Sequence, residues 1–273
     1  MKKYNRLLWI LVLLLALGCS SDSNSDGQAP PEEVSNPTPD PNVDRSGNLL
    51  ATGASANDIL SNNSFTSLRI EIAFVTGFRP TTEAISEFTE FLGAFSFKED
   101  IEIVFNELPA TDEEDLTLQE IADLETANRT VYNDGNTLGI YIYFADAPSD
   151  GDDLDSGLVT LGAVYRNTSM VIYESTIRIL LSRSNSSAVT LANVETATLN
   201  HEFGHLFGLV NLGSPAVNDH EDAGAPNHCN VPGCLMRAEL EFGSGMMNMM
   251  ENMGVVPVLD AECILDIQAN GAR

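Results

Sequence analysis

Residues 201–211 read HEFGHLFGLVN, and they close a longer run, 191–208, whose apolar residues recur at helical spacing. Two histidines in this run, His201 and His205, stand four residues apart. Side chains at that spacing lie one turn apart on the same face of a helix, so both imidazoles can reach one metal ion. The run therefore predicts a helix over 191–208 that carries two ligands of a metal site.

A carboxylate and a glycine complete the local pattern. Neutral imidazole suits zinc, and Glu202 is placed to contact a water molecule on the ion and to accept its proton, as a metal-assisted hydrolase requires. Gly208, three residues after His205, can end the helix in a left-handed turn and bring a downstream ligand back to the site.

The third ligand is not settled by the residues alone. Asn211 follows Gly208 at the position where such motifs carry their next ligand, but an amide oxygen is a poor zinc ligand beside imidazole, so it is not assigned. Two further histidines, His220 and His228, are the only others in the chain. Either could join the helical pair.

The stretch HCNVPGCLM, residues 228–236, resembles a segment of the archaemetzincins, in which the third zinc histidine directly precedes Cys-x-x-x-x-Cys-x-Met. The chain is also similar, from about residue 60 onward, to exported metzincin-type zinc metalloproteases of lipoprotein type. The resemblance implies His228 as third ligand, with His220 as its rival, and a turn at Met236 beneath the site. In archaemetzincins this segment follows the glycine almost at once, whereas here a longer connector must leave the site and return, at a small entropic cost.

The chain departs from the family at its cysteines and at one tyrosine. Archaemetzincins carry four cysteines for a second, structural zinc, and here Cys229 and Cys234 lack the later Cys-x-x-Cys pair. We therefore expect a Cys229–Cys234 disulfide in an oxidising compartment, with Cys263 as an odd buried thiol in a helix over 258–269. Ala238 stands where many metzincins place a tyrosine, so an oxyanion must be stabilised by the ion or by another residue.

The residues before the motif predict an α+β fold with α/β-like order. Strands are expected within 65–78, 101–109 and 137–148, helices within 79–95 (capped by Thr82) and 116–132, and a hairpin within 161–176. The second helix is expected to turn Leu118, Ile121, Leu124 and Val131 inward. The resemblance implies a zincin (metzincin) fold: a mixed twisted sheet with an antiparallel edge strand, packed helices, the active-site helix 191–208 and a Met-turn near residue 236.

The amino-terminal residues read as an export signal and a tether. Residues 1–18, MKKYNRLLWILVLLLALG, resemble a lipoprotein signal peptide, with Cys19 as the acylated residue. Residues 19–58 are rich in Ser, Asp, Asn and Pro and predict a disordered tether, which leaves 59–273 as the catalytic domain. The expected location is the bacterial cell envelope, with the anchor in the outer membrane.

Charge limits the partners. Forty acidic against thirteen basic residues give a net charge of −27, which excludes a nucleic-acid backbone and anionic membrane faces as partners. We expect a monomer that contacts the membrane only through its lipid. The aspartates of 150–155 could bind Ca²⁺, although a solvated turn fits their spacing better.

The sequence thus predicts a zinc-dependent endopeptidase with one catalytic Zn²⁺ and a protein or peptide substrate. Two alternatives remain open: an inactive zinc-binding surface or adhesion module on the same scaffold, and a hydrolase of a non-peptide amide.

Overall fold

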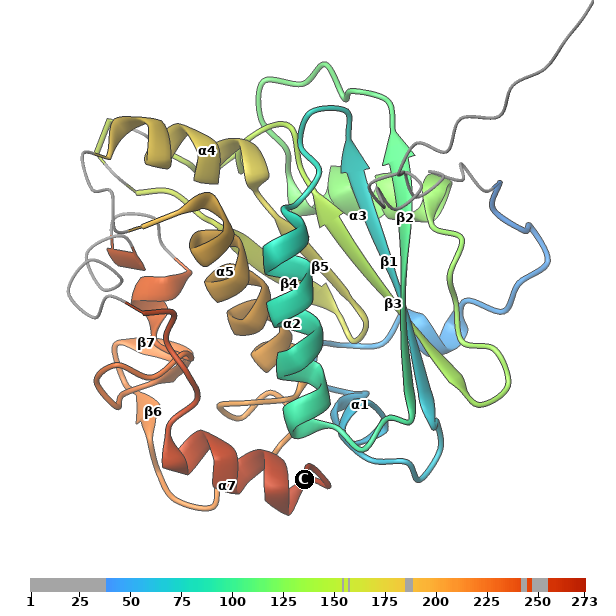
Figure 1. Cartoon of the computed structure of the whole chain (residues 1–273), viewed down its shortest axis with the longest axis vertical. Helices are drawn as coiled ribbons and strands as arrows, with labels where there is room; N and C mark the ends of the chain where they lie inside the picture. The colour runs from blue at the N-terminus through green and yellow to red at the C-terminus, as the bar shows by residue number, and fades with distance from the viewer. Residues whose placement is uncertain (1–37, 154, 157, 185–188, 242–244, 247–254) are drawn as a thin grey trace, which may run out of the picture. The chain divides into compact units, whose positions relative to one another are not determined.

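The computed structural model of the chain describes residues 38–153, 155–156, 158–184, 189–241, 245–246 and 255–273. Between residues 67 and 172 its strands and helices follow one another in the order that the sequence predicts, and Figure 1 shows their arrangement. In chain order they are η1 (Ser46–Asn48), α1 (Ala56–Leu60), β1 (Ser67–Val75), α2 (Thr82–Phe95), β2 (Asp100–Leu108), α3 (Leu118–Asn128), β3 (Thr137–Phe144), β4 (Gly162–Arg166), β5 (Ser169–Ile172), α4 (Glu174–Arg183), α5 (Leu191–Leu206), β6 (Glu221–Asp222), β7 (Ala225–Cys229), η2 (Ala238–Leu240) and α7 (Ala261–Ala269). A helix over Glu174–Arg183 was not predicted, and it begins inside the stretch 169–176 that was expected to form the second hairpin strand.

A five-stranded sheet has the order β2-β1-β3-β5-β4. The first four strands in that order are parallel, and β4 runs antiparallel to β5 at the edge. This confirms the predicted mixed sheet, its antiparallel edge strand and the β4–β5 hairpin. An edge strand offers unpaired backbone groups to another chain, and β4 is the strand that borders the site described below.

Side chains alternate between the two faces of the sheet, as the period of two in the sequence requires. Ile70, Ile72, Ile140 and Ile142 point to the face covered by α2 and α5, where the main core lies. Their neighbours in sequence, such as Ala73 and Tyr141, point to the opposite face, against α3. Figure 1 shows α2 and α5 side by side over one face of the sheet.

Three local expectations are corrected. Thr81 and not Thr82 caps α2, because its hydroxyl accepts a hydrogen bond from the amide of Ala84 at 3.2 Å. Leu118 is 43% exposed, because it is the first residue of α3, and Val131 is buried beyond the end of that helix. Helix α5 ends at Leu206, two residues earlier than predicted.

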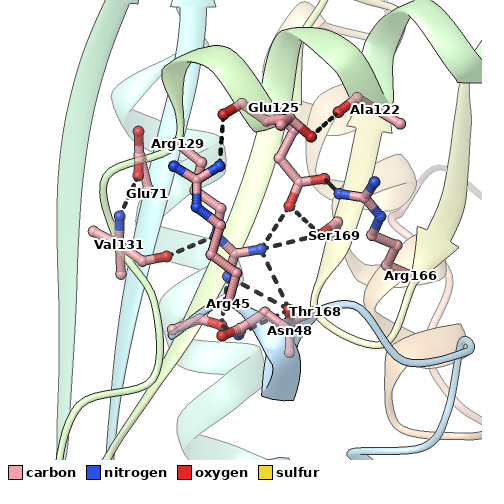
Figure 2. A network of polar contacts seen from close by, with 12 residues as sticks. Arg45, Asn48, Glu71, Ala122, Glu125, Arg129, Val131, Arg166, Thr168 and Ser169 are labelled. Carbon is pink, nitrogen blue, oxygen red and sulfur yellow. Dashed lines mark hydrogen bonds and ion pairs between the residues drawn. The ribbon is translucent and has the colours of Figure 1, made fainter. Parts of the chain in front are cut away.

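A buried polar network holds the hairpin against α3 (Figure 2). The guanidinium of Arg129, which is fully buried, donates to Glu125 at 2.6 Å and to the carbonyl of Val131 at 2.6 Å. Glu125 also accepts from Arg166 of β4 and from Ser169 of β5, each at 2.8 Å. A buried charge is tolerated where its hydrogen bonds are satisfied, so this network fixes the strand that borders the site.

The folded domain begins earlier than residue 59. The amide of Asn48 donates to Thr168 at 3.1 Å and to the carbonyl of Gly139 at 3.0 Å, and Asn167 donates to the carbonyl of Gly47. These bonds tie part of the predicted tether to the hairpin turn. The predicted signal peptide, Cys19 and the tether up to residue 37 lie outside the described residues, and no helix among those described is long and apolar enough to cross a bilayer.

Helix α5 is fixed from both neighbouring helices. Phe203 packs edge-on against Phe88 of α2 with ring centroids 5.2 Å apart, and Glu195 accepts from the amide of Thr81 at 3.0 Å. Glu174 of α4 is fully buried and bonded to Arg178 at 2.6 Å. Burial and the nearby charge of Glu195 raise the pKa of Glu174 to about 9. The neighbouring buried carboxyls of Glu174 and Glu195 therefore share a retained proton at neutral pH.

This raised pKa makes stability depend on pH. Between the unfolded value of 4.5 and about 9, the folded chain holds a proton on Glu174 that the unfolded chain has lost, so stability falls as pH rises through that window. Glu174→Gln, which stays neutral and keeps an acceptor for Arg178, should raise the melting temperature at pH 8 by about 3 °C and change it little at pH 5. Calorimetry at both pH values tests this, with the exposed Glu90→Gln on α2 as the control. Destabilisation at both pH values would show that the Arg178 ion pair dominates.

Candidate metal centre

Helix α5 delivers two imidazoles into the interior. The hydroxyl of Thr190 caps its first turn by accepting from the amide of Asn193 at 3.2 Å. His201 and His205 are both buried, one turn apart. Gly208 then adopts a φ of +77°, and a Cβ there would lie 2.6 Å from the amide nitrogen of Ser214. Only glycine fits this turn, which is where the sequence predicts that the chain changes direction.

A third imidazole, that of His228, meets the helical pair. Its ring centroid lies 5.4 Å from that of His201 and 5.2 Å from that of His205, and the two helical rings are 4.9 Å apart. One nitrogen from each ring lies within 4.8 Å of the other two. The structure therefore brings together His201, His205 and His228, and it places the rival His220 elsewhere.

The hydrogen bonds show which ring nitrogens carry a proton and which can bind an ion. Nδ1 of His201 lies 2.7 Å from the carbonyl oxygen of Leu235, and Nδ1 of His228 lies 3.1 Å from that of Pro226. A carbonyl only accepts, so each Nδ1 carries the proton and each Nε2 has a free lone pair in the neutral ring. Nε2 of His228 lies 2.8 Å from a carboxylate oxygen of Glu241 but makes no hydrogen bond of acceptable geometry.

These distances fit a zinc ion. A tetrahedral ion with Zn–N bonds of about 2.0–2.1 Å holds its ligand atoms about 3.3–3.4 Å apart, and the Nε2 atoms of His201 and His205 are 3.3 Å apart. Burial followed by the charge of His228 lowers the pKa of His201 to about 4, and burial with both neighbouring rings lowers that of His205. Both helical rings are therefore neutral, as metal ligands must be.

Glu202 lies beside this group and is 1% exposed. Its Oε1 has no hydrogen-bond partner among the described residues. A Cβ on Gly162, the first residue of the edge strand, would come within 2.6–2.8 Å of the Glu202 carboxyl group, so that glycine makes room for it. Burial and then the charge of Glu241 raise the pKa of Glu202 well above its ordinary value.

A cavity of about 300 Å³ opens beside these groups. Its lining combines the edge strand with the charged residues of the site, including Ala163, Val164, Glu202, His205, His228 and Glu241. An extended chain placed against β4 would therefore pass Glu202, His205 and His228.

Met236 packs beneath the helical pair. It is fully buried, and a Cβ on Gly204, between the two helical histidines, would lie 2.3 Å from its sulfur. The backbone around it is tied down, since the carbonyl of Met236 accepts from the amide of Cys229 at 2.7 Å. Close approach of this segment to α5 thus requires glycine at 204. A turn of the metzincin kind at Met236 stays a prediction.

The expected Cys229–Cys234 disulfide is not formed. The thiols of Cys229, Cys234 and Cys263 are free and buried, with Sγ of Cys234 3.6 Å from Sγ of Cys263. Nδ1 of His220 lies 3.3 Å from Sγ of Cys229, and Asp266 bonds the other nitrogen of that ring at 2.7 Å. The cysteines therefore converge on His220, not on each other as a pair, because α7 brings Cys263 to the connector.

This second group also fits a metal ion. Ligand atoms of His220, Cys229, Cys263 and the half-buried Asp260 all lie within 4.8 Å of one another. Hydrogen bonds from Cys229 and Cys263 lower the pKa of the Cys234 thiol. The group holds two thiols, one imidazole and one carboxylate, and Sγ of Cys234 lies 3.6 Å from that of Cys263 as a third thiol beside it. Thiols and imidazole are the donors typical of structural zinc.

Strand β7 links the two groups, because His228 and Cys229 are consecutive residues at its end. Successive side chains of a strand point to opposite sides. The imidazole of His228 therefore meets α5, while the thiol of Cys229 meets His220.

The remaining predicted positions lie outside both groups. Asn211 is exposed, has a φ of +68° and donates from its amide to Glu221 at 2.8 Å. In the 150–155 loop, Asp152 accepts from the amide of Thr160 and Asp153 from that of Asp155. These carboxylates shape a turn, and calcium binding there stays a prediction. Leu154 lies outside the described residues.

Three site residues escaped the sequence analysis: Gly162, Glu241 and Asp266. Gly162 and Asp266 are separated from Glu202 and His220 by tens of residues, and Glu241 is one of several acidic residues after Met236. No local pattern marks any of them. Only the Cys-x-x-x-x-Cys spacing hinted that further ligands were to be sought for the cysteines.

No protein-family profile matches the chain, and no curated protein matches it at a significant level. Among solved structures it is similar to archaemetzincin from Methanopyrus kandleri, at 18% identity over 76% of this chain and 96% of that one, with a TM-score of 0.46. It is also similar to a zinc-dependent peptidase from Methanocorpusculum labreanum (strain Z), at 13% identity over 72% of this chain and 99% of that one, with a TM-score of 0.42. For metalloproteinase-II from Bacteroides fragilis the identity is 14%, the coverage 77% of this chain and 55% of that one, and the TM-score 0.37. One of these structures carries the family name that residues 201–236 resemble, and at these low identities the function proposed below rests on the geometry of the site.

Proposed function

We propose that this chain is a zinc-dependent endopeptidase whose catalytic ion is held by His201, His205 and His228. The observation that carries this proposal is the meeting of three buried imidazoles from two segments, with one ligand nitrogen of each ring within 4.8 Å of the other two. Buried polar atoms without partners are costly. A bound zinc ion would satisfy these nitrogens and would acidify a water molecule and polarise a substrate carbonyl.

The residues of this chain then divide the remaining work. Glu202 accepts a proton from the attacking water at its free Oε1 and returns it to the leaving amine. Its position in the lining of the cavity, beside His205, supports this role. Gly162 keeps that oxygen in place and accessible.

Strand β4 is the proposed binding edge for an extended peptide substrate. Its residues Ala163 and Val164 line the cavity next to Glu202 and His205. Backbone pairing to an edge strand holds a peptide without demanding a particular sequence. A location in the bacterial cell envelope, acylation at Cys19 and a monomeric state are further parts of this proposal, supported by the sequence of residues 1–58 and by the charge.

We also propose a second, structural zinc ion held by Cys229, Cys234, Cys263 and His220. Support comes from the convergence of His220, Cys229 and Cys263, from the 3.6 Å contact of the Cys234 and Cys263 sulfurs, and from Asp266, which fixes the ring of His220. A hydrogen bond from a carboxylate to the outer nitrogen of a metal-binding histidine is the usual way to orient it. This ion is additional to the single catalytic one predicted from the sequence.

Glu202→Gln should abolish proton transfer while leaving zinc binding intact. We expect turnover of an unstructured protein substrate to fall by about 100-fold or more, with unchanged zinc content by atomic absorption. Chelator should stop the wild-type reaction and fresh zinc should restore it. Wild-type rates in the variant would refute the mechanism. Zinc binding without any turnover of peptides or of simple amides by the wild type would favour the inactive binding module.

The two histidine assignments predict different zinc losses. Wild type should hold about two zinc ions per chain. His228→Ala should retain the ion at the cysteines and lose activity. His220→Ala and Cys263→Ser should retain the catalytic ion and lower the melting temperature, because a structural ion contributes to folding free energy. The reverse pattern, with activity dependent on His220 and not on His228, would exchange the two roles.

A further inference from the structure

A short segment before the first strand reaches the cavity of the metal centre. Thr52 lines this cavity, together with Leu212 of the connector after α5 and with Ala163 and Val164 of the edge strand. It belongs to residues 19–58, whose composition predicts a disordered tether, and it is far in sequence from all the other lining residues. The segment 50–53 is held at the cavity by two attachments, one at the hairpin turn and one at the connector.

The first attachment is Asn167, which lies in the turn between β4 and β5 and is fully buried. The amide of Leu50 donates to the side-chain oxygen of Asn167, and the amide of Asn167 donates to the carbonyl of Leu50, each at 3.0 Å. The side-chain amide of Asn167 donates to the carbonyl of Gly47 and to the hydroxyl of Ser55, each at 2.8 Å. Asn167 therefore binds the chain on both sides of Thr52, through buried hydrogen bonds that are costly to break.

The second attachment is a close contact of two glycines. Gly53 has a φ of +78°, and a Cβ there would lie 1.5 Å from the carbonyl oxygen of Leu212. A Cβ on Gly213 would lie 2.5 Å from the carbonyl oxygen of Gly53. The two backbones thus touch with no room for a side chain between them, as only glycine permits. The segment 50–53 therefore closes the cavity on the side between the hairpin turn and the connector.

Of the segment 50–53, Thr52 is the residue that lines the cavity. It is half-buried and stands in a tight turn, in which the amide of Ala54 donates to the carbonyl of Ala51 at 3.1 Å. The cavity of about 300 Å³ is at the small end of the range of ligand sites. A change of a few atoms at Thr52 therefore alters a substantial part of the room that a ligand finds there.

The rest of the lining indicates which kind of side chain the cavity accepts. Its apolar members Leu118, Val164 and Leu212 come from three separate segments and favour an apolar occupant. Its acidic members, Glu202 and Glu241, repel an anionic side chain. No lysine or arginine occurs among the described residues that line it. The cavity thus suits an uncharged, apolar side chain of limited size.

We propose that Thr52 is a specificity-determining residue, whose side chain sets the largest apolar side chain of a peptide substrate that fits beside Glu202 and His205. This inference rests on the proposed function, because it assumes a peptide bound along β4. A substrate with a longer side chain meets a wall that is held at both ends. A substrate with a smaller one leaves part of the cavity unfilled and binds less tightly.

Two substitutions at Thr52 change the cavity in opposite directions. On the zinc-loaded full chain, kcat/KM is measured for peptides that differ only in one residue flanking the cleaved bond, which is Val, Phe, Asp or Lys, with each flank varied in turn. A group added to or removed from an apolar pocket changes discrimination about tenfold or more. Thr52→Ala should raise the Phe-to-Val ratio of kcat/KM about tenfold, and Thr52→Leu should lower it about tenfold, at one flank only.

Leu49→Ala is the matched control. Leu49 precedes the segment 50–53, is 50% exposed and is not part of the cavity lining. This variant should keep the wild-type ratio at both flanks. Melting temperatures show whether each variant folds, and if one Thr52 variant folds poorly, the other still tests the ratio.

The outcomes separate this inference from the function on which it rests. A wild-type ratio at both flanks in the Thr52 variants, or an equal loss of turnover on every peptide, overturns the role of Thr52 and leaves the proposed function standing. A wild-type preference for Asp or Lys at the flank that responds to Thr52 overturns the apolar occupant. If the wild type cleaves no peptide in a zinc-dependent manner, the proposed function fails, and this inference fails with it.

Discussion

The meeting of three imidazoles in a water-poor interior is the constraint around which the rest of the domain is arranged. Burial keeps the rings of His201 and His205 neutral, so both can offer a nitrogen lone pair to an ion. Elsewhere in the domain a buried charged group has its partners within the protein. The guanidinium of Arg129 donates to Glu125 and to backbone carbonyls (Figure 2). Paired charges hold the scaffold together, whereas nitrogen lone pairs of the imidazoles mark the candidate metal site.

Two glycines make this meeting sterically possible. Gly204 lets Met236 approach α5 between the two helical histidines, and Gly162 lets the edge strand approach Glu202. The sheet, the helix and the 228–236 segment therefore contact one another through positions where any larger side chain would collide with a functional group. Glu202 therefore lies between the edge strand and the helical histidines, in the lining of the cavity.

Much of the fold could be predicted because its signals are local. Alternation in residues 67–75 and 137–144 arises because successive side chains of a strand point to opposite faces of the sheet. The spacing of His201 and His205 corresponds to one helical turn. The second cluster could not be predicted, since Cys263 joins it from α7 and no periodicity links that helix to Cys229. The same holds for the start of the domain, where Asn48 looks like linker sequence yet satisfies its amide on the hairpin. Buried polar residues whose hydrogen-bond partners lie far away in the sequence show no local sequence pattern.

The group of three histidines and the group of cysteines each take one residue from the end of β7, His228 and Cys229. Residues 228 and 229 are consecutive, so the same stretch of backbone positions the Cys229 thiol and the imidazole on the other side of the strand. Oxidising agents attack sulfur and leave imidazole largely untouched. Oxidation of Cys229 would therefore act at the residue next to His228, so the thiols expose the histidine group to damage that spares its own side chains.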